Sequence, residues 1–253
     1  GGQVSRIEFG DEKTAQSTID TTNQAYEVGQ ARAEELISLG INLNLSPVLD
    51  TTGPGDFVFN RTFQTGSFQA GQFAKALLAG QRSSHILSTL KHFPGYGSIT
   101  FNPEQKLAVV QELPDISPFV FALSAQPEFL MLSNVIYSDV DPNQPFSFSE
   151  KGISIVRSDL DFSHIILSDD LSQPSLLENY PLEEISTAPL RAGINMVIIS
   201  NAETAEDIHE IVQEQILKDP LLKKRIEESG QLILELKKEK EFVEPFGKLV
   251  ELK

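Results

Sequence analysis

The chain has 253 residues, of which 40% are hydrophobic and 22% charged, enough for one large α/β domain or two small ones. Its formal net charge of -16 repels phosphate backbones and anionic lipid surfaces, so we expect neither nucleic acid nor membrane partners. The absence of cysteine excludes disulfides, zinc ribbons and thiol nucleophiles, and no apolar run is long enough for a membrane-spanning helix.

The first third of the chain alternates helical and strand patterns. Apolar residues at helical spacing predict a helix over residues 22–38, and the alternation of apolar and polar side chains over 41–45 predicts a strand. Residues 51–66 hold several Gly, Pro and Thr, which indicates a long loop. A helix over 67–82 and a strand over 86–90 are expected to follow.

The alternation continues to the end of the chain after an irregular stretch over 93–103. The remaining expected helices cover residues 104–112, 118–125, 149–159, 181–191, 204–217 and 220–240. The remaining expected strands cover 129–136, 163–167 and 194–200, and their nearly continuous apolar runs indicate a parallel sheet. Alternating units favour an α/β fold, either a (β/α)-barrel or a doubly wound sheet. Since no linker interrupts them, we expect a single domain over residues 1–253.

Several side chains able to do chemistry fall at or just past the ends of expected strands, namely Asp50, Lys91, His92, Asn134 and Asp169. In barrels the carboxyl ends of the strands carry the active site. A carboxylate at the mouth of a buried strand is costly unless it has a function, so Asp169 is the leading candidate for a reactive group. The alternative is that Asp169 or Asp170 is an N-cap for the following segment.

The two most informative strings are Lys91-His92-Phe93-Pro94-Gly95-Tyr96-Gly97 and Ser168-Asp169-Asp170-Leu171. Together they resemble the catalytic domain of glycoside hydrolase family 3, most closely its single-domain bacterial β-N-acetylglucosaminidase branch. The resemblance covers nearly the whole chain and implies a (β/α)8 TIM-like barrel. Because Gly1-Gly2-Gln3-Val4 resembles the tail of an internal family segment, we expect the barrel to be incomplete at the N-terminus, without its first strands.

The resemblance implies roles for individual residues. Asp169 matches the Asp that attacks the anomeric carbon, and Lys91 and His92 match groups that bind sugar hydroxyls. Asp50 matches an acid that accepts hydrogen bonds from the sugar's outer hydroxyls. Arg61 matches the Arg of an Asp-Arg-x-Phe motif, although the preceding Asp is an Asn here, and its alternative role is a loop-pinning ion pair.

The acid/base loop departs from the family pattern. The family's Asp-Ser-His trio, whose His is the acid/base, falls on Asn102-Pro103-Glu104, and the His inside the Gly-x-Gly is Tyr96. The family's strand-end His is Asn134, which we expect to contact the substrate. Two interpretations follow: Glu104 acts as the acid/base, or the site has lost its acid/base and retains only sugar binding. A Glu that opens a helix is also an ordinary first-turn acid.

The leading functional expectation is a retaining hydrolase that cleaves terminal β-linked N-acetylglucosamine, or a related β-sugar, from a small carbohydrate or peptidoglycan fragment, as in cell wall recycling. Retention needs a carboxylate nucleophile and a proton donor, here Asp169 and either Glu104 or an unidentified base. The alternative is a catalytically degenerate carbohydrate-binding or scaffold protein, against which the retained nucleophile and sugar-binding residues argue. An aldolase-type barrel is disfavoured because Lys91, the strand-end Schiff-base candidate, is followed by His and Pro-Gly.

Cofactors and metals are not implied by any motif. The four His residues are scattered without an i, i+4 pair, and nothing resembles a phosphate-binding loop, so we expect neither a cofactor nor a metal. We expect a soluble, cytoplasmic monomer.

Overall fold

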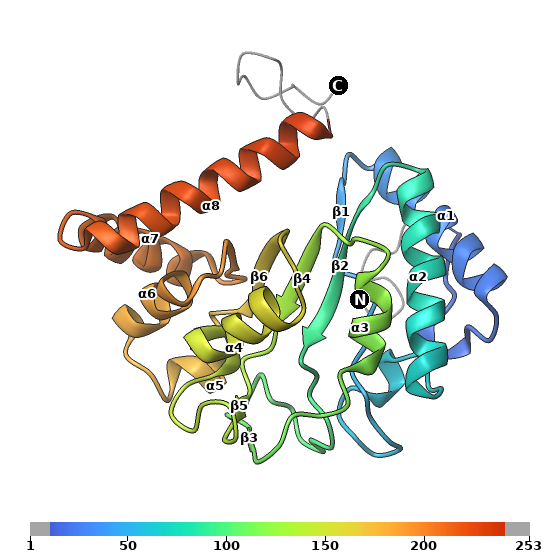
Figure 1. The fold of residues 1–253 in the computed structure, drawn as a ribbon, viewed down its shortest axis with the longest axis horizontal. Helices are drawn as coiled ribbons and strands as arrows, with labels where there is room; N and C mark the ends of the chain where they lie inside the picture. The colour runs from blue at the N-terminus through green and yellow to red at the C-terminus, as the bar shows by residue number, and fades with distance from the viewer. Residues whose placement is uncertain (1–10, 241–253) are drawn as a thin grey trace.

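The computed structural model of the chain describes residues 11–240. Its centre is a parallel sheet of five strands in the order β1-β2-β4-β6-β7, which curls into a half-barrel (Figure 1). A second, two-stranded parallel sheet pairs β3 with β5. The strands are β1 Leu43–Asn44, β2 Leu87–Phe93, β3 Val109–Val110, β4 Phe129–Leu132, β5 Ile136–Tyr137, β6 Ile165–Asp170 and β7 Met196–Ile198.

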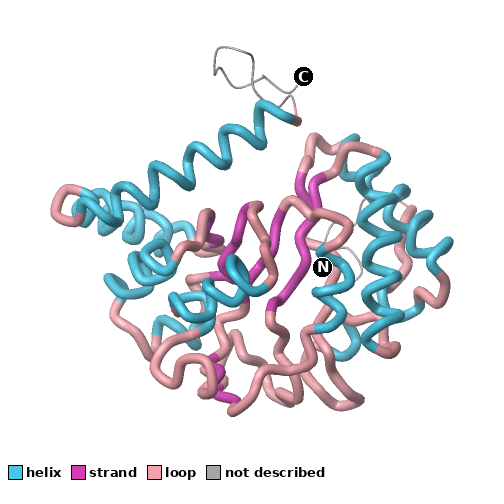
Figure 2. Tube along the Cα trace, in the orientation of Figure 1, coloured by secondary structure: helices cyan, strands magenta, loops and turns pink. Residues whose placement is uncertain are grey.

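Helices connect successive strands and surround the sheet, whereas loops gather at the carboxyl ends of the strands (Figure 2). The helices are α1 Thr22–Ser38, α2 Ser67–Ser83, α3 Ser117–Leu123, α4 Glu150–Ser154, α5 Pro174–Leu177, α6 Leu182–Ala192, α7 Ala202–Ile216 and α8 Pro220–Glu239. Helix α4 continues as a π turn over Ile155–Asp159, and short 3-10 turns cover Gln16–Thr18, Phe59–Arg61 and Phe146–Phe148.

Side-chain caps define where the long helices begin. Thr21 accepts a hydrogen bond from the backbone of Gln24 at the start of α1, and Asn201 caps α7 in the same way. The Asp219 carboxylate accepts from two backbone N–H groups of the first turn of α8, where Pro220 occupies the first position. These caps satisfy N–H groups that have no partner within their own helix.

Helices α1 and α2 cross at glycines. A Cβ atom added to Gly29 would lie 2.3 Å from the carbonyl oxygen of Leu77, and one added to Gly80 would lie 2.1 Å from that of Tyr26. Neither site has room for a side chain, so the two backbones approach as closely as they do only because both positions are Gly.

The two faces of the sheet are covered by different helices. Leu90, Leu130 and Ile166 face the outer core, which they share with side chains of α1 to α4. The opposite face holds a second cluster of buried side chains, namely Leu87, Phe129, Met131, Ile165 and Leu167. Helix α8 covers this cluster with the partly buried side chains of Leu232, Ile233 and Leu236. Because Leu87, Phe129 and Ile165 begin or nearly begin their strands, α8 covers the amino-terminal part of this face.

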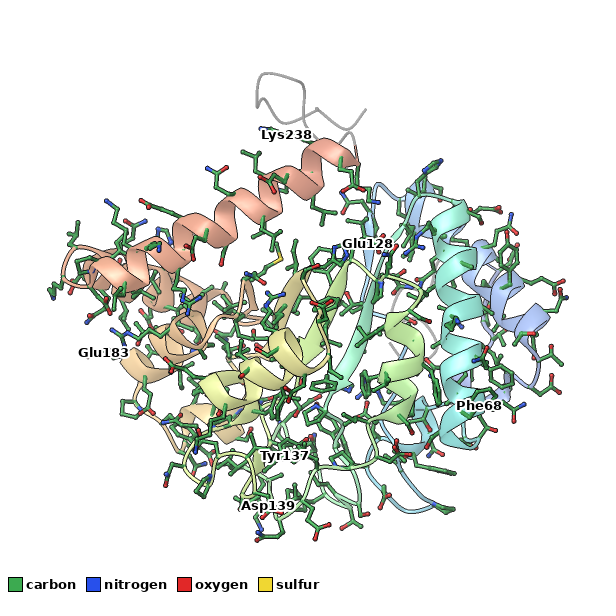
Figure 3. All side chains as sticks on the ribbon, viewed as in Figure 1. Phe68, Glu128, Tyr137, Asp139, Glu183 and Lys238 are labelled. Atoms are coloured by element: carbon green, nitrogen blue, oxygen red, sulfur yellow. The ribbon has the colours of Figure 1, made fainter. Side chains whose placement is uncertain are left out.

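The amino and carboxyl ends of the strands lie on opposite sides of the molecule. Glu128, just before β4, lies beside the end of α8, where its carboxylate is 3.8 Å from the Lys240 ammonium. Tyr137 lies at the other end of the molecule, among the loops that follow the strands (Figure 3). The carboxyl-terminal edge of the sheet is therefore left to the loops.

The predicted α/β class with a parallel sheet is confirmed. Strands β1 and β7 form the two edges, and within residues 11–240 they do not pair with each other, so the curl is a half-barrel. The helices predicted over 22–38, 67–82 and 220–240 agree with α1, α2 and α8 to within a residue.

The helix predicted over 104–112 is wrong. Residues 103–105 form turns, and Val109–Val110 is strand β3, which pairs with β5. An Asx turn explains the difference, because the Asn102 side chain accepts a hydrogen bond from the Glu104 backbone at 2.9 Å and competes with a helix. The strand predicted over 129–136 is two strands, β4 and β5, separated at residues 133–135.

Two predicted strands extend further than expected. Strand β2 continues to Phe93 and strand β6 to Asp170, so Lys91, His92 and Asp169 lie within strands rather than after them. The carboxyl ends of the two strands therefore carry the candidate groups themselves. Strand β4 lies between them in the sheet.

Candidate active site

Strands β2 and β6 bring the two sequence motifs together. The hydroxyl of Tyr96, in the loop after β2, donates a hydrogen bond of 2.7 Å to Oδ2 of Asp169 at the end of β6. Lys91, in β2, lies close enough to Asp169 and Asp50 for both carboxylates to affect its pKa. The residues that the sequence predicted as nucleophile and sugar binders thus share one site at the carboxyl ends of the strands.

Asp169 and Asp170 differ in what their carboxylates contact. The Asp170 carboxylate accepts hydrogen bonds from the backbone and hydroxyl groups of both Ser172 and Ser200, which joins the loops after β6 and β7. Burial raises the pKa of Asp170, but these hydrogen bonds outweigh it and the net pKa is lowered. The Asp170 carboxylate therefore has a structural role.

Asp169 is the carboxylate of the pair with fewer hydrogen bonds among residues 11–240. Its side chain is half-buried, and its Oδ1 accepts from the backbone N–H of Asp170 at 2.8 Å. Together with the Tyr96 hydroxyl on Oδ2, this gives each carboxylate oxygen one donor from the described residues 11–240 and leaves lone pairs for a substrate. This environment suits a nucleophile better than an N-cap, because neither donor belongs to a following helix.

Asp50 is buried and accepts three hydrogen bonds from residues at the end of β2 and in the loop after it. They come from the His92 backbone at 3.0 Å, from His92 Nδ1 at 2.9 Å and from the Tyr96 backbone at 2.8 Å. Burial opposes the charge on Asp50, but the interactions with His92 and Tyr96 prevail and lower its pKa. Asp50 therefore positions His92 and the Tyr96 loop, and its contact with sugar hydroxyls stays a prediction.

His92 is 3% exposed, and burial is the main reason that its pKa is lowered, against the raising effect of Asp50. We therefore treat the imidazole as neutral, with the proton on Nδ1, because that nitrogen faces the Asp50 carboxylate. Nε2 is then an acceptor. The ring stacks on Tyr96 with centroids 4.7 Å apart.

Lys91 is 5% exposed and supplies positive charge beside the carboxylates. Burial lowers its pKa most, followed by the charge of Arg61, while Asp169 and Asp50 raise it. Arg61 ends the 3-10 turn Phe59–Arg61 and also affects the pKa of Tyr96, which places it in the same cluster. Two cations thus lie near the Asp169 carboxylate.

Asn134, after β4, is buried with its amide engaged on both sides. Its Nδ2 donates to the carbonyl of Asp170 at 3.1 Å, and its Oδ1 accepts from the Ser147 hydroxyl at 2.5 Å. The amide therefore ties the end of β4 to the end of β6. Its predicted contact with the substrate stays a prediction.

Glu104 lies in a turn, not at the start of a helix. Its carbonyl accepts a hydrogen bond of 3.0 Å from the backbone of Ser175, in helix α5 just after β6, so the loop is attached near the site. Its carboxylate is half-exposed and makes no hydrogen bond to another residue of the described range 11–240. Its role as acid/base stays a prediction.

Two tyrosines contribute to the site in ways the sequence did not reveal. Tyr96 was recognised only as a departure from the family motif, yet its hydroxyl contacts the candidate nucleophile. Tyr137, in β5, donates a hydrogen bond to the Gly95 carbonyl and holds the same loop. The only available signal was the aromatic residue inside the strand-end motif, because the Tyr137 contact spans 42 residues.

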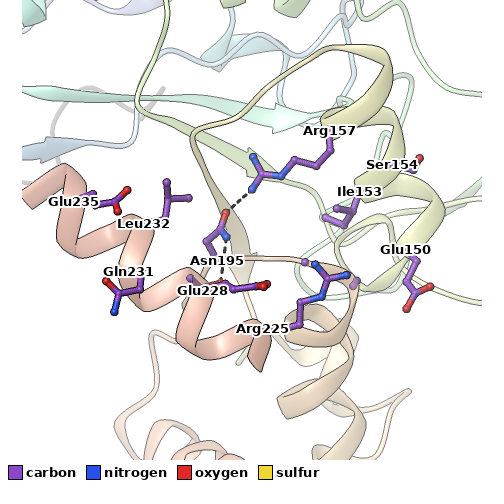
Figure 4. A pocket seen from close by; sticks show the side chains of 13 residues that line it. Glu150, Ile153, Ser154, Arg157, Asn195, Arg225, Glu228, Gln231, Leu232 and Glu235 are labelled. Atoms are coloured by element: carbon purple, nitrogen blue, oxygen red, sulfur yellow. Dashed lines mark hydrogen bonds between the residues drawn. The ribbon is translucent and has the colours of Figure 1, made fainter. Parts of the chain in front are cut away.

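A separate cavity lies between α4, the end of α6 and α8. It has a volume of about 720 Å³. Arg157 lines it, and burial lowers the pKa of this residue to about 10. Its guanidinium donates to Asn195, which in turn bonds to Ser229 of α8 (Figure 4). We regard this cavity as a structural junction, because its buried arginine is satisfied by the protein itself.

Among residues 11–240, no group of three or more His, Asp or Glu side chains is placed to hold a metal ion. In the same range, no helix is long and apolar enough to cross a membrane.

The fold and the cluster define a class: a barrel-type α/β domain with a carboxylate-centred site at the carboxyl ends of its strands. Residues 1–236 match the family described as the glycosyl hydrolase family 3 N terminal domain. The chain therefore belongs to glycoside hydrolase family 3.

Relatives and solved structures agree with this assignment. The chain is 31% identical over 207 residues to a beta-hexosaminidase of Idiomarina loihiensis, covering 79% of this chain and 60% of the relative. A beta-hexosaminidase of Hydrogenovibrio crunogenus is also 31% identical, over 72% of this chain and 53% of its own length. The chain thus spans little more than half the length of these curated relatives.

Among solved structures, the beta-N-acetylhexosaminidase of Beutenbergia cavernae superposes with a TM-score of 0.81 at 26% identity, over 88% of this chain and 70% of that one. A family 3 beta-N-acetylglucosaminidase from Paenibacillus superposes with a TM-score of 0.85 at 22% identity, over 99% of this chain and 52% of that one. The second likeness concerns the fold alone.

Proposed function

We propose that this domain carries the active site of a retaining glycoside hydrolase that removes terminal β-linked N-acetylglucosamine, with Asp169 as the nucleophile. The observation that carries the proposal is the half-buried Asp169 carboxylate, which within residues 11–240 has one donor on each oxygen and lies beside the buried Lys91. The names of the curated relatives support the choice of sugar.

The first chemical step forms a covalent intermediate. An oxygen of Asp169 attacks the anomeric carbon, the bond to the leaving oxygen breaks, and that oxygen takes a proton from the acid, for which Glu104 is the candidate. Since the Glu104 carboxylate has no hydrogen bond to the described residues, it is free to turn toward the substrate. The Pro103 next to it restricts that movement, so we expect weak acid catalysis and a preference for good leaving groups.

Sugar recognition is assigned to the cations and the imidazole of the cluster. Lys91 and Arg61 donate to hydroxyls, and Nε2 of a neutral His92 accepts from one. Asp50 contributes mainly through His92, because its own oxygens already accept three hydrogen bonds. The substrate we propose is a small carbohydrate or a peptidoglycan fragment with a terminal N-acetylglucosamine.

The alternative function is a carbohydrate-binding protein without catalysis. It is favoured by the lack of any hydrogen bond between Glu104 and the cluster within residues 11–240. It is disfavoured by the half-buried carboxylate of Asp169 with its two donors, which sugar binding alone does not require.

Intact-mass spectrometry after incubation with a 5-fluoro N-acetylglucosaminyl fluoride tests the proposal. Fluoride is a good leaving group that needs little acid assistance, so the reagent tests the nucleophile separately from Glu104. We expect a covalent adduct that maps to Asp169 after proteolysis. A folded protein that binds N-acetylglucosamine but forms no adduct would instead be a binding protein.

Glu104→Gln is the matched variant for the acid/base assignment. The variant is expected to form the adduct at an unchanged rate but to hydrolyse it about 10²–10⁴-fold more slowly, because the water then lacks its base. Added azide, which needs no base, is expected to restore turnover. Unchanged hydrolysis in Glu104→Gln would remove Glu104 from the mechanism and leave Asp169 untouched.

A further inference from the structure

The Tyr96 hydroxyl is the side-chain donor to the candidate nucleophile. It donates to Asp169 Oδ2 at 2.7 Å, while the other oxygen accepts from a backbone N–H at 2.8 Å. The backbone donor cannot be removed by substitution, but the hydroxyl can. The two donors therefore allow the contribution of one to be measured while the other stays in place.

The position of the Tyr96 hydroxyl is fixed by the surrounding structure. The backbone N–H of Tyr96 donates to Asp50, and its ring lies nearly parallel to His92, with an interplanar angle of 12°. The flanking residues Gly95 and Gly97 have φ angles of 119° and 62°, which glycine adopts without strain. The hydroxyl is thus presented to Asp169 by a loop held at its backbone and at its ring.

Tyr96 is also suited to remain a donor. Burial raises its pKa well above the ordinary value for tyrosine, and the charges of Asp169 and Asp50 raise it further. The raised pKa favours the protonated phenol, which is the form that donates a hydrogen bond. Its contact with Asp169 indicates that the hydroxyl acts through that carboxylate rather than as the acid/base, for which Glu104 is the candidate.

The hydrogen bond affects the two chemical steps differently. When the glycosyl-enzyme breaks down, the bond from the anomeric carbon to the Asp169 oxygen breaks and its electron pair returns to the carboxylate. A water oxygen bonds to the carbon, and the water proton goes to the base. A donor fixed beside the carboxylate stabilises the charge that develops there and speeds this step.

In the first step the same carboxylate loses charge as it attacks. A donor then stabilises the starting anion more than the transition state, while it also holds the oxygen in position for attack. These two effects oppose each other. The net effect on adduct formation is therefore smaller than the effect on breakdown.

We propose that Tyr96 is a positioning residue whose hydroxyl holds the Asp169 carboxylate and assists its departure from the glycosyl-enzyme. The inference rests on the proposed retaining mechanism and assigns a function to the position where this chain departs from the family motif. It predicts a variant in which the intermediate accumulates although the nucleophile is intact.

The test compares the native protein with Tyr96→Phe, which keeps the stacked ring and removes only the hydroxyl. Formation and hydrolysis of the 5-fluoro N-acetylglucosaminyl adduct are followed separately by mass spectrometry. We expect hydrolysis to slow by about 10- to 100-fold, the range for loss of a hydrogen bond to a charged group, with formation changed by less than about threefold.

Tyr180→Phe is the matched control, because the Tyr180 ring contacts Phe148 outside the site. Both of its rates are expected to equal those of the native protein. Tyr96→Phe with unchanged hydrolysis, or with both steps slowed by the same factor, would overturn the inference. If the native protein forms no adduct, the proposed function fails, and the inference fails with it.

A second variant is available if Tyr96→Phe does not fold. Incorporation of 3-fluorotyrosine at position 96 keeps the hydroxyl and makes it a stronger donor. Adduct hydrolysis is then expected to be faster than in the native protein, and an equal or slower rate would contradict the inference.

Discussion

Asp169 and Asp170 are neighbours in the chain, yet their carboxylates contact different parts of the protein. Asp169→Asn is expected to abolish adduct formation and to lower turnover by about 10⁴-fold or more, as loss of a nucleophile does. Asp170→Asn is expected to retain an adduct at Asp169. It should lower the free energy of unfolding by about 1–3 kcal/mol, because an amide nitrogen replaces an oxygen that accepts hydrogen bonds.

Mass spectrometry of the adduct and urea denaturation of both variants check this pair of expectations. Asp170→Asn keeps the side-chain volume, so a loss of stability reports on hydrogen bonds rather than on packing. The opposite pattern, with Asp170→Asn unreactive and Asp169→Asn reactive, would reassign the nucleophile to Asp170.

The buried His92 makes stability depend on pH in the mildly acid range. Burial lowers its pKa in the folded state below the ordinary 6.5, so the unfolded chain binds a proton more readily than the folded one. Stability is therefore complete above pH 6.5 and is lost as the pH falls toward the folded-state pKa, by at most about 1.4 kcal/mol per pH unit. The lowered pKa of Asp50 affects stability only below pH 3.8, in a more acid range than His92.

Thermal melts between pH 4 and pH 8 measure this dependence. His92→Gln is expected to remove the loss of stability just below pH 6.5, even if the variant is less stable overall. His209→Gln, in α7, is the control: its side chain is exposed, so the pH dependence should equal that of the native protein. Equal slopes in all three proteins would mean that His92 is not buried as a neutral group.

Membership of the candidate site could be predicted from the sequence where it depended on a residue's position along a strand. Lys91, His92 and Asp169 were found because they end apolar runs, and the sheet brings those ends together. The partners of each group could not be predicted, because Tyr96 and Asp169 are 73 residues apart and their contact depends on the register of two strands. The contacts of Asp50 with His92 and Tyr96 could not be predicted from the sequence either, and its contact with sugar hydroxyls stays a prediction.

At the scale of elements, the α1–α2 crossing depends on glycine. A Cβ at Gly80 would lie 2.1 Å from one backbone atom of α1 and 2.8 Å from another, so Gly80→Ala must separate the helices. We expect the free energy of unfolding to fall by about 1–3 kcal/mol. Gly230→Ala, in the open middle of α8, should instead raise it by about 0.5–1 kcal/mol.

Guanidinium denaturation of Gly80→Ala and Gly230→Ala measures the change in the free energy of unfolding for both variants. Because both glycines lie inside helices, the substitution has the same effect on helix propensity in each. The difference between them therefore reports the close approach at Gly80. A stabilised Gly80→Ala would mean that the helices have room to separate.

Helices and strands could be predicted where one periodic pattern dominated the sequence. The prediction failed where local hydrogen bonds competed with that pattern. The long helices α1, α2 and α8 follow apolar periodicity and were placed to within a residue. Residues 104–112 carry a helical pattern too, but the Asx turn at Asn102 redirects the chain and Val109–Val110 pairs with a strand that lies further along. No property of residues 104–112 alone identifies that partner.

At the scale of the whole molecule, the sheet residues that α8 covers and the candidate site lie toward opposite ends of the strands. Helix α8 covers the amino-terminal part of the inner sheet face, while Asp169 and Lys91 lie near the carboxyl ends. A change at α8 should therefore alter how much protein is folded without altering the site in the molecules that are folded.

Leu222 and Leu221 test this separation, because these neighbours in α8 are 0% and 76% exposed. Leu222→Ala is expected to lower the free energy of unfolding by about 2–5 kcal/mol, as a buried leucine does, and Leu221→Ala to change it by less than about 0.5 kcal/mol. Adduct formation, measured per folded molecule at a temperature where both variants are folded, should equal that of the native protein. A slower rate in Leu222→Ala at full folding would show that α8 also shapes the site.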